Sequence, residues 1–371
     1  VTPVTDKVTV TITGNTASEK YDGTEKTASG YGVSISNEKY TEADFEFKGN
    51  AEVKGTDANT YPMGLTAANF TNKSANFTNV EFVVTDGSLT INKRSVTLTS
   101  ASDSKVYDGT ALTNDKVTVG GADGFADGEG AMYDVTGSQT VVGESDNTFT
   151  YTLNEGTKAD NYTITKTEGK LKVTAATDEV VVTIKENSGT AKYDGAEHKV
   201  EGYDVTSISN PLYKDTDFTF SGTAEVKGTD AGTYDMALKP EDFANTNANF
   251  SKVTFKIEDG QLVINKREVT LTSASDKKVY DGTALTNGTV TVGGADGFAD
   301  GEGAAYDVTG TQTNVGKSNN TFTYTLNEGT KAGNYEITKT EGELEVTAAT
   351  NEVVVTITEH SGTAKYDGAE H

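Results

Sequence analysis

The tripeptide Tyr-Asp-Gly recurs five times along the chain, at intervals of about 86 residues. Its tyrosines are Tyr21, Tyr107, Tyr193, Tyr280 and Tyr366. A sequence that repeats at a fixed interval folds as copies of one structural unit, so chain length alone does not predict the number of domains. The 371 residues are therefore predicted to form a tandem array of small modules.

The repeats alternate between two types. Type A copies share Ala-Glu-Val-Lys-Gly-Thr-Asp-Ala (51–58 and 224–231), and type B copies share Val-Tyr-Asp-Gly-Thr-Ala-Leu-Thr-Asn (106–114 and 279–287). We name the predicted modules A1 (1–94), B1 (95–176), A2 (177–267) and B2 (268–349); residues 350–371 are predicted to be the first strand and Tyr-Asp-Gly turn of a third type A module. The chain is expected to be a piece of a longer array.

Composition restricts the partners and the location. The sequence has no cysteine, which excludes disulfides and thiolate metal sites. Its formal net charge is −25, and nucleic acids and anionic membranes are polyanions that attract basic surfaces, so neither is an expected partner. No apolar run approaches the roughly 18 residues of a membrane-spanning helix. The Thr-, Asn- and Gly-rich composition favours an extracellular location.

Apolar and polar residues alternate, which is the period of a β-strand with one buried face. Val8, Val10 and Ile12 alternate with threonines in A1. The same pattern recurs at Val180, Val182 and Ile184 in A2, and at Phe149, Tyr151 and Leu153 in B1. We predict an all-β fold in which each module is a small immunoglobulin-like β-sandwich of antiparallel strands. The alternative is a small single-sheet module packed on a helical turn.

Two local patterns predict a turn at the module end and a short helix. An acidic residue followed by glycine closes every module, at Asp86-Gly87, Glu168-Gly169, Asp259-Gly260 and Glu341-Gly342. Asp-Gly is typical of tight β-hairpin turns, whose central residues need positive φ, so we expect a hairpin there. The stretch 239–243 has proline early and acids after it, which predicts a single helical turn in type A.

The junctions between modules are short and lack glycine and proline. Only Asn265, Lys266 and Arg267 separate the end of A2 from the opening strand of B2. A flexible tether would be longer and rich in Gly and Ser. We therefore expect a stiff, elongated, monomeric rod. Strands of up to ten residues, at roughly 3.3 Å each, give about 30 Å for a module and about 120 Å for four.

Several motifs recur in every full module: Lys/Val-Tyr-Asp-Gly, then Gly232-Thr233-Tyr234 or residues 148–153, then Asn161-Tyr162 or Asn249-Phe250, and a closing Gly-x-Leu-x-Ile/Val. Together they resemble the YDG and MBG-type repeats of large bacterial surface proteins, over nearly the whole chain. The resemblance implies a structural or adhesive segment of a long, wall-attached or secreted protein. It supplies no catalytic motif.

Tyr-Asp-Gly is either a repeated ligand contact or a structural turn. Glycine permits the positive φ of a turn, and a tyrosine packed on a core needs a partner for its hydroxyl. We interpret the motif as a turn, because it occurs in both module types, and a binding role would need an exposed ring. The predicted turn residues are Tyr21, Asp22, Gly23, Tyr107, Asp108, Gly109, Tyr193, Asp194, Gly195, Tyr280, Asp281 and Gly282.

A Gly-rich acidic loop in type B is the candidate metal site. Its acids are Asp123, Asp127 and Glu129 in B1, and Asp296, Asp300 and Glu302 in B2. Ca²⁺ prefers hard oxygen ligands, and glycines allow a loop to curve around the ion. The spacing is not that of an EF-hand, so an ordinary acidic loop without a cofactor is the competing interpretation.

The sequence offers little for catalysis. The histidines are His198, His360 and His371, and none has a counterpart in A1, where Lys26 aligns with His198. No nucleophile elbow, P-loop, dinucleotide fingerprint or zinc-protease motif is present. We predict that the fragment is not an enzyme.

The leading hypothesis is a structural and adhesive stalk that projects a binding domain from a bacterial cell. The alternative is that the repeats themselves bind a host glycan or host protein, such as mucin or immunoglobulin, and that tandem copies add avidity. Residues 106–174 of B1 are nearly identical to the aligned residues of B2. The A copies differ from each other at 37–40 in A1 and 210–213 in A2. A repeated site would then lie most simply on the B surface.

Overall fold

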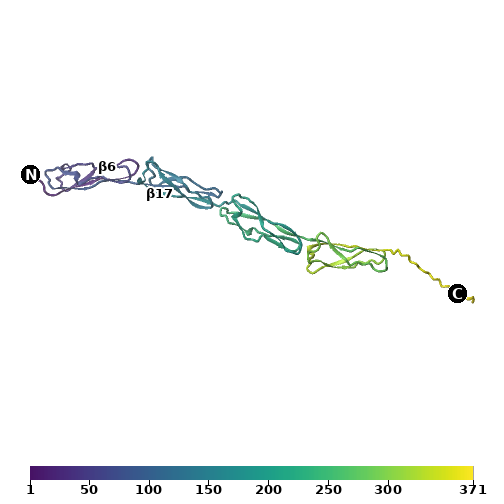
Figure 1. The fold of residues 1–371 in the computed structure, drawn as a ribbon. Coiled ribbons are helices and arrows are strands. Elements are labelled where there is room, and N and C mark those ends of the chain that lie inside the picture. The colour runs from purple at the N-terminus through teal and green to yellow at the C-terminus, as the bar shows by residue number, and fades with distance from the viewer. Residues whose placement is uncertain (371) are drawn as a thin grey trace. The chain divides into compact units, whose positions relative to one another are not determined.

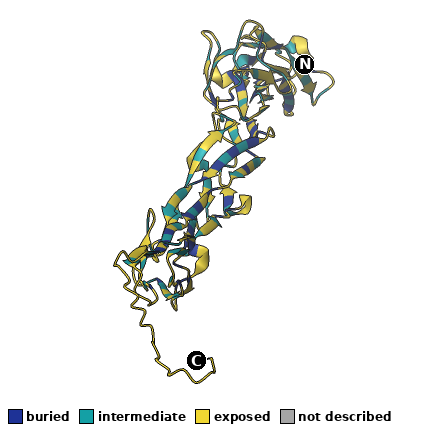
Figure 2. Cartoon of the chain, turned by 90° about the vertical axis from the view of Figure 1, so that its right-hand side faces the viewer, coloured by how far each residue is buried: buried dark blue, intermediate teal, exposed yellow. Residues whose placement is uncertain are grey.

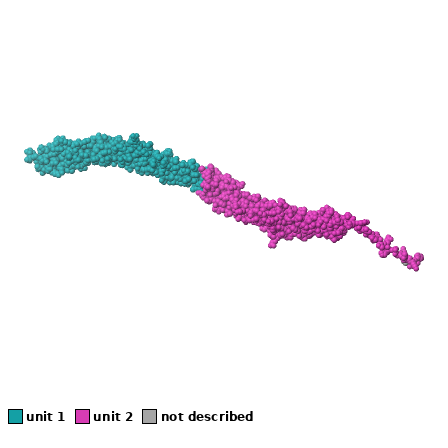
Figure 3. All heavy atoms as spheres, in the orientation of Figure 1, with its two compact units in different colours: residues 1–179, 247–252 teal, residues 180–246, 253–371 magenta. Residues whose placement is uncertain are grey.

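The computed structural model describes residues 1–370; His371, at the end of the predicted third module, lies outside the described residues. Within 1–370 the ribbon consists of β-strands, loops and short 3-10 turns without an α-helix, so the predicted all-β class is confirmed (Figure 1). None of the described helical turns is long or apolar enough to cross a membrane. Contacts divide the chain into unit 1 (Val1–Glu179 and Asn247–Lys252) and unit 2 (Val180–Thr246 and Val253–His371) (Figure 3).

Unit 1 contains the strands of A1 and B1, two of which, β6 and β17, are labelled in Figure 1. The strands of A1 are β1 (Val8–Gly14), β2 (Thr16–Lys20), β3 (Lys26–Ser29), β4 (Tyr31–Ile35), β5 (Phe45–Phe47), β6 (Glu52–Gly55), β7 (Thr60–Pro62), β8 (Phe70–Asn72), β9 (Val80–Thr85) and β10 (Ser88–Asn92). Those of B1 are β11 (Arg94–Ser100), β12 (Asp103–Val106), β13 (Val117–Gly120), β14 (Ala131–Val135), β15 (Gly143–Asn147), β16 (Phe149–Leu153), β17 (Tyr162–Thr167) and β18 (Gly169–Thr174).

Two three-stranded mixed sheets form each module of unit 1. In A1, β1 is central in the order β4-β1-β9, antiparallel to β4 and parallel to β9. β10 is central in β2-β10-β7, parallel to β2 and antiparallel to β7. B1 repeats this as β13-β11-β17 and β12-β18-β15. Two-stranded sheets β3-β6, β5-β8 and β14-β16 complete the unit. An immunoglobulin-like sandwich has antiparallel sheets, so the parallel pairs depart from the expected pairing.

Unit 2 repeats these sheets in A2 and B2. The strands of A2 are β19 (Val180–Glu186), β20 (Gly189–Lys192), β21 (His198–Glu201), β22 (Tyr203–Ile208), β23 (Phe218–Phe220), β24 (Glu225–Gly228), β25 (Gly232–Asp235), β26 (Phe243–Asn245), β27 (Val253–Glu258) and β28 (Gln261–Asn265). Those of B2 are β29 (Arg267–Ser273), β30 (Asp276–Val279), β31 (Val290–Gly293), β32 (Ala304–Val308), β33 (Gly316–Asn319), β34 (Phe322–Leu326), β35 (Tyr335–Thr340) and β36 (Glu343–Thr347). The three-stranded orders are β22-β19-β27, β20-β28-β25, β31-β29-β35 and β30-β36-β33.

The predicted closing hairpin is wrong. β9 and β10, on either side of Asp86-Gly87, lie in different sheets and pair with β1 and β2. The chain therefore crosses from one sheet to the next at the acidic-Gly pair, beside the equivalent crossing between β1 and β2. None of the four glycines at these pairs has positive φ. Glycine is needed here for close approach, since a Cβ on Gly87 would lie 2.5 Å from the carbonyl oxygen of Asn15.

Different side chains satisfy the amides at the crossing. In B1, the Gly169 amide donates to Ser100 Oγ (2.9 Å). In A2 the residue at the position of Ser100 is Glu186, which is 1% exposed and accepts from the Gly260 amide (2.7 Å) and the Leu238 amide (2.5 Å). The position is Gly14 in A1, where Asp86 accepts from the amides of residues 64 and 65 instead. The crossing is thus retained while its polar partner changes.

The hydrophobic core follows the alternation of the central strands. Val8, Val10 and Ile12 are fully buried, and threonines between them are partly exposed, as predicted. Figure 2 shows the buried positions along the strands of the chain. In β16 only Phe149 is buried, whereas Tyr151 is 36% exposed. β16 pairs with β14 in a two-stranded sheet, so the alternation predicted there does not produce a fully covered face.

The predicted helical turn at 239–243 is present as the 3-10 turn η5 (Pro240–Asp242). It is not confined to A2. Equivalent turns are η1 (Glu42–Asp44), η2 (Ala67–Asn69), η3 (Ala159–Asn161), η4 (Asp215–Asp217) and η6 (Ala332–Asn334). Proline followed by acids predicted only η5. Several of the other turns end at an asparagine or aspartate whose side chain bonds to the nearby backbone, which is a weaker sequence signal for a helical turn.

Residues 351–370 contain no strand. The predicted first strand of a third type A module is therefore not formed, and Val353, Val355 and Ile357 are 84%, 74% and 83% exposed. In A1 the equivalent strand is held between β4 and β9, and these neighbours have no counterpart here. The turn at Asp367 is present, because its carboxylate accepts from the Ala369 amide (3.1 Å).

We predict that Gly342→Ala destabilises B2. A Cβ there would lie 2.4 Å from the Ser273 carbonyl oxygen, which is backbone and cannot move aside easily. Overpacking of this kind costs about 1–3 kcal/mol. Gly288→Ala is the matched control, since nothing lies within 4 Å of its Cβ position. Calorimetry should show a lower unfolding temperature for the first variant only; equal unfolding temperatures would contradict the account.

Candidate functional site

The tyrosine of the first Tyr-Asp-Gly lies at the junction of A1 and B1. Tyr21 follows β2, is 4% exposed, and packs edge-on against Tyr162 of β17, with ring centroids 5.7 Å apart. Both hydroxyls donate to Glu129 in the acidic loop of B1: Tyr21 to Oε1 at 2.5 Å and Tyr162 to Oε2 at 2.8 Å. One carboxylate thus joins a type A motif to a type B strand.

The same contact changes the acidity of both phenols. Burial, followed by the hydrogen bond to Glu129, raises the pKa of Tyr21 to about 12. Burial also raises the pKa of Tyr162 to about 12, against a lowering contribution from the Ala126 amide, which donates to its oxygen. A neutral phenol is an effective donor to a carboxylate, so the junction is most stable where both tyrosines are protonated.

Arg94 fixes the acidic loop against the motif. Its Nε donates to the Gly124 carbonyl (2.9 Å) and its Nη2 to the Asp123 carbonyl (2.5 Å). Its Nη1 donates to the Tyr21 carbonyl at 3.3 Å. The guanidinium therefore bonds to both modules through backbone oxygens, and its fixed fork geometry suits such multiple contacts.

Asp123 forms the charged part of the junction. Its carboxylate pairs with Lys20 at the end of β2 and accepts from the Ser95 amide (2.8 Å). The pairing with Lys20, followed by the Ser95 amide, lowers the pKa of Asp123. The Asp123 side chain is 9% exposed, so the carboxylate is turned into the junction and away from solvent.

A second bridge connects A1 and B1 through Asp57 in the shared type A run. Lys158 Nζ pairs with Asp57 at 2.8 Å, and the Asn161 side-chain amide donates to Asp57 at 3.0 Å. Asn161 Oδ1 accepts from the Ala58 amide at 2.7 Å. Asn161 is fully buried, so its bonds hold a loop of A1 on the η3 turn of B1. The contacts with Lys158 and Asn161 lower the pKa of Asp57.

One hydrophobic cluster spans the junction. It includes Leu89 and Ile91 from β10 of A1, and Val96 and Leu98 from β11 of B1. Lys93 is the single residue between these strands. A1 and B1 therefore share apolar core as well as polar contacts, unlike domains separated by a mobile linker.

Unit 2 has the same junction between A2 and B2. Tyr193 and Tyr335 donate to Glu302, the latter at 2.8 Å, and their rings pack edge-on at 5.7 Å. Lys192 pairs with Asp296 at 2.7 Å. The remaining contacts of unit 1 also recur: Arg267 donates to three carbonyls, and Asp230 bonds to Lys331 and Asn334.

The structure does not bring the candidate calcium ligands together around a common point. Asp123 pairs with Lys20 and Glu129 with two tyrosines, while Asp127 is exposed. Their B2 counterparts Asp296, Asp300 and Glu302 are placed in the same way. Over residues 1–370 no group of three or more His, Asp or Glu side chains is arranged to hold a metal ion. The prediction of calcium receives no support from this geometry.

The Tyr-Asp-Gly turns share one geometry, although their tyrosines differ. Gly23, Gly109, Gly195 and Gly282 have φ of 82°, 80°, 86° and 83°, and the aspartate before each accepts from the amide two residues later. Tyr21 and Tyr193 are 4% exposed at the A-to-B junctions, and Tyr107 is half-buried. Tyr280 is 43% exposed.

Local partners stabilise the turn aspartates. Lys26 pairs with Asp22, Lys105 with Asp108 and Lys278 with Asp281. These lysines, together with the amides at the turn, lower the pKa of each aspartate. In A2, His198 takes the place of Lys26 beside Asp194. The only histidine within a described strand thus contacts a turn aspartate.

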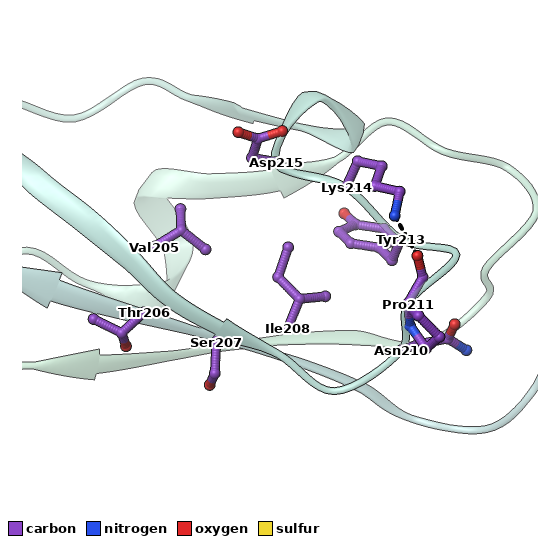
Figure 4. Close-up of a pocket in the computed structure, with 9 residues that line it drawn as sticks. All are labelled: Val205, Thr206, Ser207, Ile208, Asn210, Pro211, Tyr213, Lys214 and Asp215. Atoms are coloured by element: carbon purple, nitrogen blue, oxygen red, sulfur yellow. Dashed lines mark hydrogen bonds between the residues drawn. The ribbon is translucent and has the colours of Figure 1, made fainter.

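A hollow of about 430 Å³ lies in unit 2, where the type A copies diverge (Figure 4). β22 has one residue more than its counterpart in A1, and the ladder with β19 shifts register between Thr183 and Ile184. Such bulges are common next to binding sites. The lining residues are Val205, Thr206, Ser207, Ile208, Asn210, Pro211, Tyr213, Lys214 and Asp215.

The sequence pattern singled out Tyr21, Asp123 and Glu129 but not their contacts across the junction, and it did not indicate Arg94 or Asp57. The chain has only two arginines, Arg94 and Arg267, and both follow Asn-Lys at an A-to-B boundary. The recurrence of a rare residue at equivalent boundaries could have indicated a structural contact there. The polar contacts that cross the A1–B1 junction join residues 73 to 108 positions apart, as in Arg94 with Tyr21 and Tyr21 with Glu129, so no local motif shows them.

We predict that Tyr21→Phe weakens unit 1 by about 1–3 kcal/mol, because it removes a hydrogen bond to a charged acceptor that is partly buried. Tyr151→Phe, at a 36% exposed ring in B1, is the control and should change stability by less than about 0.5 kcal/mol. Chemical denaturation followed by circular dichroism measures both. Similar effects for the two variants would show that the Glu129 contact contributes nothing to stability.

We predict that stability falls as pH rises from 10 to 12. The folded pKa values of Tyr21 and Tyr162 are about 12, above the value of 10 for a free tyrosine. The folded state therefore holds protons that the unfolded state releases in this window, and its stability decreases. The double variant Tyr21→Phe, Tyr162→Phe should show a shallower decline in the unfolding midpoint. An unchanged slope would refute the contribution of these phenols.

The type A modules match a known protein family. The MBG domain family matches residues 8–93 and 180–266, which lie within A1 and A2. No curated protein matches the chain. The chain therefore carries MBG domain repeats at two positions, 8–93 and 180–266.

Proposed function

We propose that this chain is a non-enzymatic spacer of a bacterial surface protein, an adhesive stalk that holds a binding domain away from the cell. The observation that carries the proposal is the A-to-B junction. It combines a shared apolar cluster with a network centred on Glu129, and the same network recurs around Glu302. A segment that transmits position along a chain needs such joints, because a flexible linker would not keep its ends apart.

The connection between modules supports this role. β10 ends at Asn92 and β11 begins at Arg94, so Lys93 alone links A1 to B1. Lys266 has the same place between β28 and β29. One residue between two strands leaves little freedom for the modules to rotate against each other. We therefore infer a stiff rod built from A-B pairs.

The matched MBG domains and the surface charge support an extracellular location. MBG domains are typical of surface proteins, and the formal net charge of −25 favours solubility and repulsion between neighbouring copies. A secreted or wall-attached protein is the setting in which these properties are useful. We propose an extracellular location on this basis.

Multivalent binding of a host glycan or host protein, such as mucin or immunoglobulin, is the second candidate. The hollow beside the bulge of β22 favours it, since it combines the apolar Val205 and Ile208 with polar groups of Asn210 and Lys214 (Figure 4). It lies in a type A module, whereas sequence identity favoured the type B surface. Tyr213 contributes its ring but bonds its hydroxyl to Asp217 and Asn245.

We predict that small-angle X-ray scattering of the chain gives a maximum dimension of at least about 120 Å. This is the summed length of four modules whose strands have roughly ten residues. Insertion of a short Gly-Ser segment between Lys93 and Arg94 should broaden the distance distribution, because it separates the junction contacts. A compact particle, or a distribution unaffected by the insertion, would contradict the spacer.

A matched variant tests the binding candidate. Pro211→Glu with Leu212→Lys gives A2 the residues of A1 at this loop, so folding should be retained. If the hollow binds a glycan or a serum protein, an array or pull-down should detect binding that the double variant loses. Binding that the double variant keeps, or no binding by either protein, would disfavour the hollow as a site.

A further inference from the structure

The end of B1 opposite A1 is covered by a short segment of unit 1, residues 247–252. The Tyr107 ring meets Phe250 edge-on, with centroids 5.5 Å apart. The Val142 amide donates to Asn249 Oδ1 at 2.8 Å, and the Ala176 amide donates to the Asn249 carbonyl at 2.9 Å. We call Tyr107, Val142 and Ala176 the end surface of B1.

This contact is a packed interface. Phe250 is 2% exposed, Ala176 is 9% exposed, and Val142 is half-buried. Tyr107 and Val142 also lie against the buried cluster of B1, which contains Leu112, Leu171 and Val173. The segment thus extends the apolar core of B1 and accepts hydrogen bonds from two of its backbone amides, those of Val142 and Ala176.

B2 has the same end surface without the covering segment. Tyr280, Val315 and Ala349 align with the three residues of B1, and Val346 to Thr350 repeats the sequence Val173 to Thr177. Tyr280 is 43% exposed, Val315 is 56% exposed, and Ala349 is exposed. The cluster beneath is formed as in B1, with Leu285, Leu344 and Val346 buried.

The chain shows which kind of segment covers such a surface. Residues 248–250 are Ala-Asn-Phe, and A1 contains Ala-Asn-Phe at 75–77. Val4 bridges to Phe77 and donates to the Asn76 carbonyl (2.8 Å), as Ala176 does with Phe250 and Asn249. In A1 the tip is therefore already folded, and Asn76 is exposed. An Ala-Asn-Phe tip is a preformed feature of type A modules.

We propose that Tyr280, Val315 and Ala349 form a docking surface for the Ala-Asn-Phe tip of a type A module joined to this chain at residue 350. The tip asparagine accepts from the Val315 amide, and the tip phenylalanine packs edge-on against Tyr280. Two features favour a covalently joined module. Residues 350–371 already have the opening sequence of type A, with Val353, Ile357 and Tyr366 at the equivalent positions. A joined module also has a high effective concentration, so a small contact suffices.

The inference does not depend on the adhesive role. It concerns the order of modules: type B ends accept type A tips, as type A ends accept type B loops at the Glu129 junction. Each module type then has two different ends, which enforces alternation.

The first test uses the unaltered chain. Hydrogen exchange followed by mass spectrometry reports on the peptide that contains Val142. Asn249→Ala should speed exchange of the Val142 amide by at least about tenfold, because its acceptor is removed. Asn76→Ala, at the exposed counterpart, is the control and should leave this peptide unchanged. Equal exchange in all three proteins would show that the tip asparagine does not bind B1, and the proposal would fall.

The second test adds the proposed occupant. Residues 350–371 are replaced by a second copy of residues 177–267, so that B2 is followed by a complete type A module. The Val315 amide should then exchange at least about tenfold more slowly than in the unaltered chain. Nitration of Tyr280 by tetranitromethane should also fall several-fold. Changing only the added copy's tip asparagine to alanine should restore fast exchange at Val315.

Three results would overturn the proposal. Val315 exchange that stays fast, although the opening strand of the added module is protected, would show that the tip does not dock. An added module that stays unfolded would show that the end of B2 does not accept it, since the same sequence folds after B1. Protection of Val315 in the unextended chain that increases with protein concentration would assign the surface to a second copy.

Discussion

Each A-to-B junction depends on one carboxylate that lies between two tyrosines from different modules. Glu129 accepts from Tyr21 and Tyr162, and Glu302 accepts from Tyr193 and Tyr335. A partly buried carboxylate is unfavourable without such donors, so the two hydroxyls, one from each module, stabilise the loop that carries it. In unit 1 the apolar cluster that contains Leu89 and Leu98 also contains Tyr21 and Tyr162, so it holds both rings beside Glu129. Polar and apolar contacts therefore favour the same arrangement of A and B.

The path of the chain explains how the junction is reached. In every module, two parallel segments cross together from one three-stranded sheet to the next, and the glycine of the acidic-Gly pair permits their close approach. β10, the last strand of A1, follows this crossing and is the central strand of its sheet. After Lys93 the chain continues as β11, which is the central strand of a sheet in B1. The backbone that organises one module thus begins the next. This continuity is the physical basis for the proposed spacer.

The sequence was informative about the repeat and the alternating strands, because both are local properties. Val8, Val10 and Ile12 are buried as their spacing predicts, and η5 forms where Pro240 begins it. The hairpin prediction failed because Asp-Gly has the same local signal whether the chain turns back or crosses to another sheet. The partners of the crossing, β1 and β2, lie more than seventy residues away from β9 and β10.

The candidate site could be predicted only in part. The sequence indicated either a calcium site or an ordinary acidic loop, and neither interpretation included the pairing of Asp123 with Lys20 or of Glu129 with tyrosines. Lys20 and Tyr21 belong to A1 and Tyr162 lies on β17 of B1, so spacing within the loop shows none of these partners. The two arginines at equivalent boundaries were the accessible signal, since a recurring rare residue at a joint indicates a structural contact.

Glu129 and the shared cluster hold A1 and B1 together as one rigid body. Residual dipolar couplings of backbone amides in β1, β9, β11 and β17 test it most directly, because they report the orientation of each strand in a common frame. If A1 and B1 are one rigid body, one alignment tensor fits the couplings of both modules. Separate tensors of different magnitude for A1 and B1 would show that the modules move independently, and would contradict it.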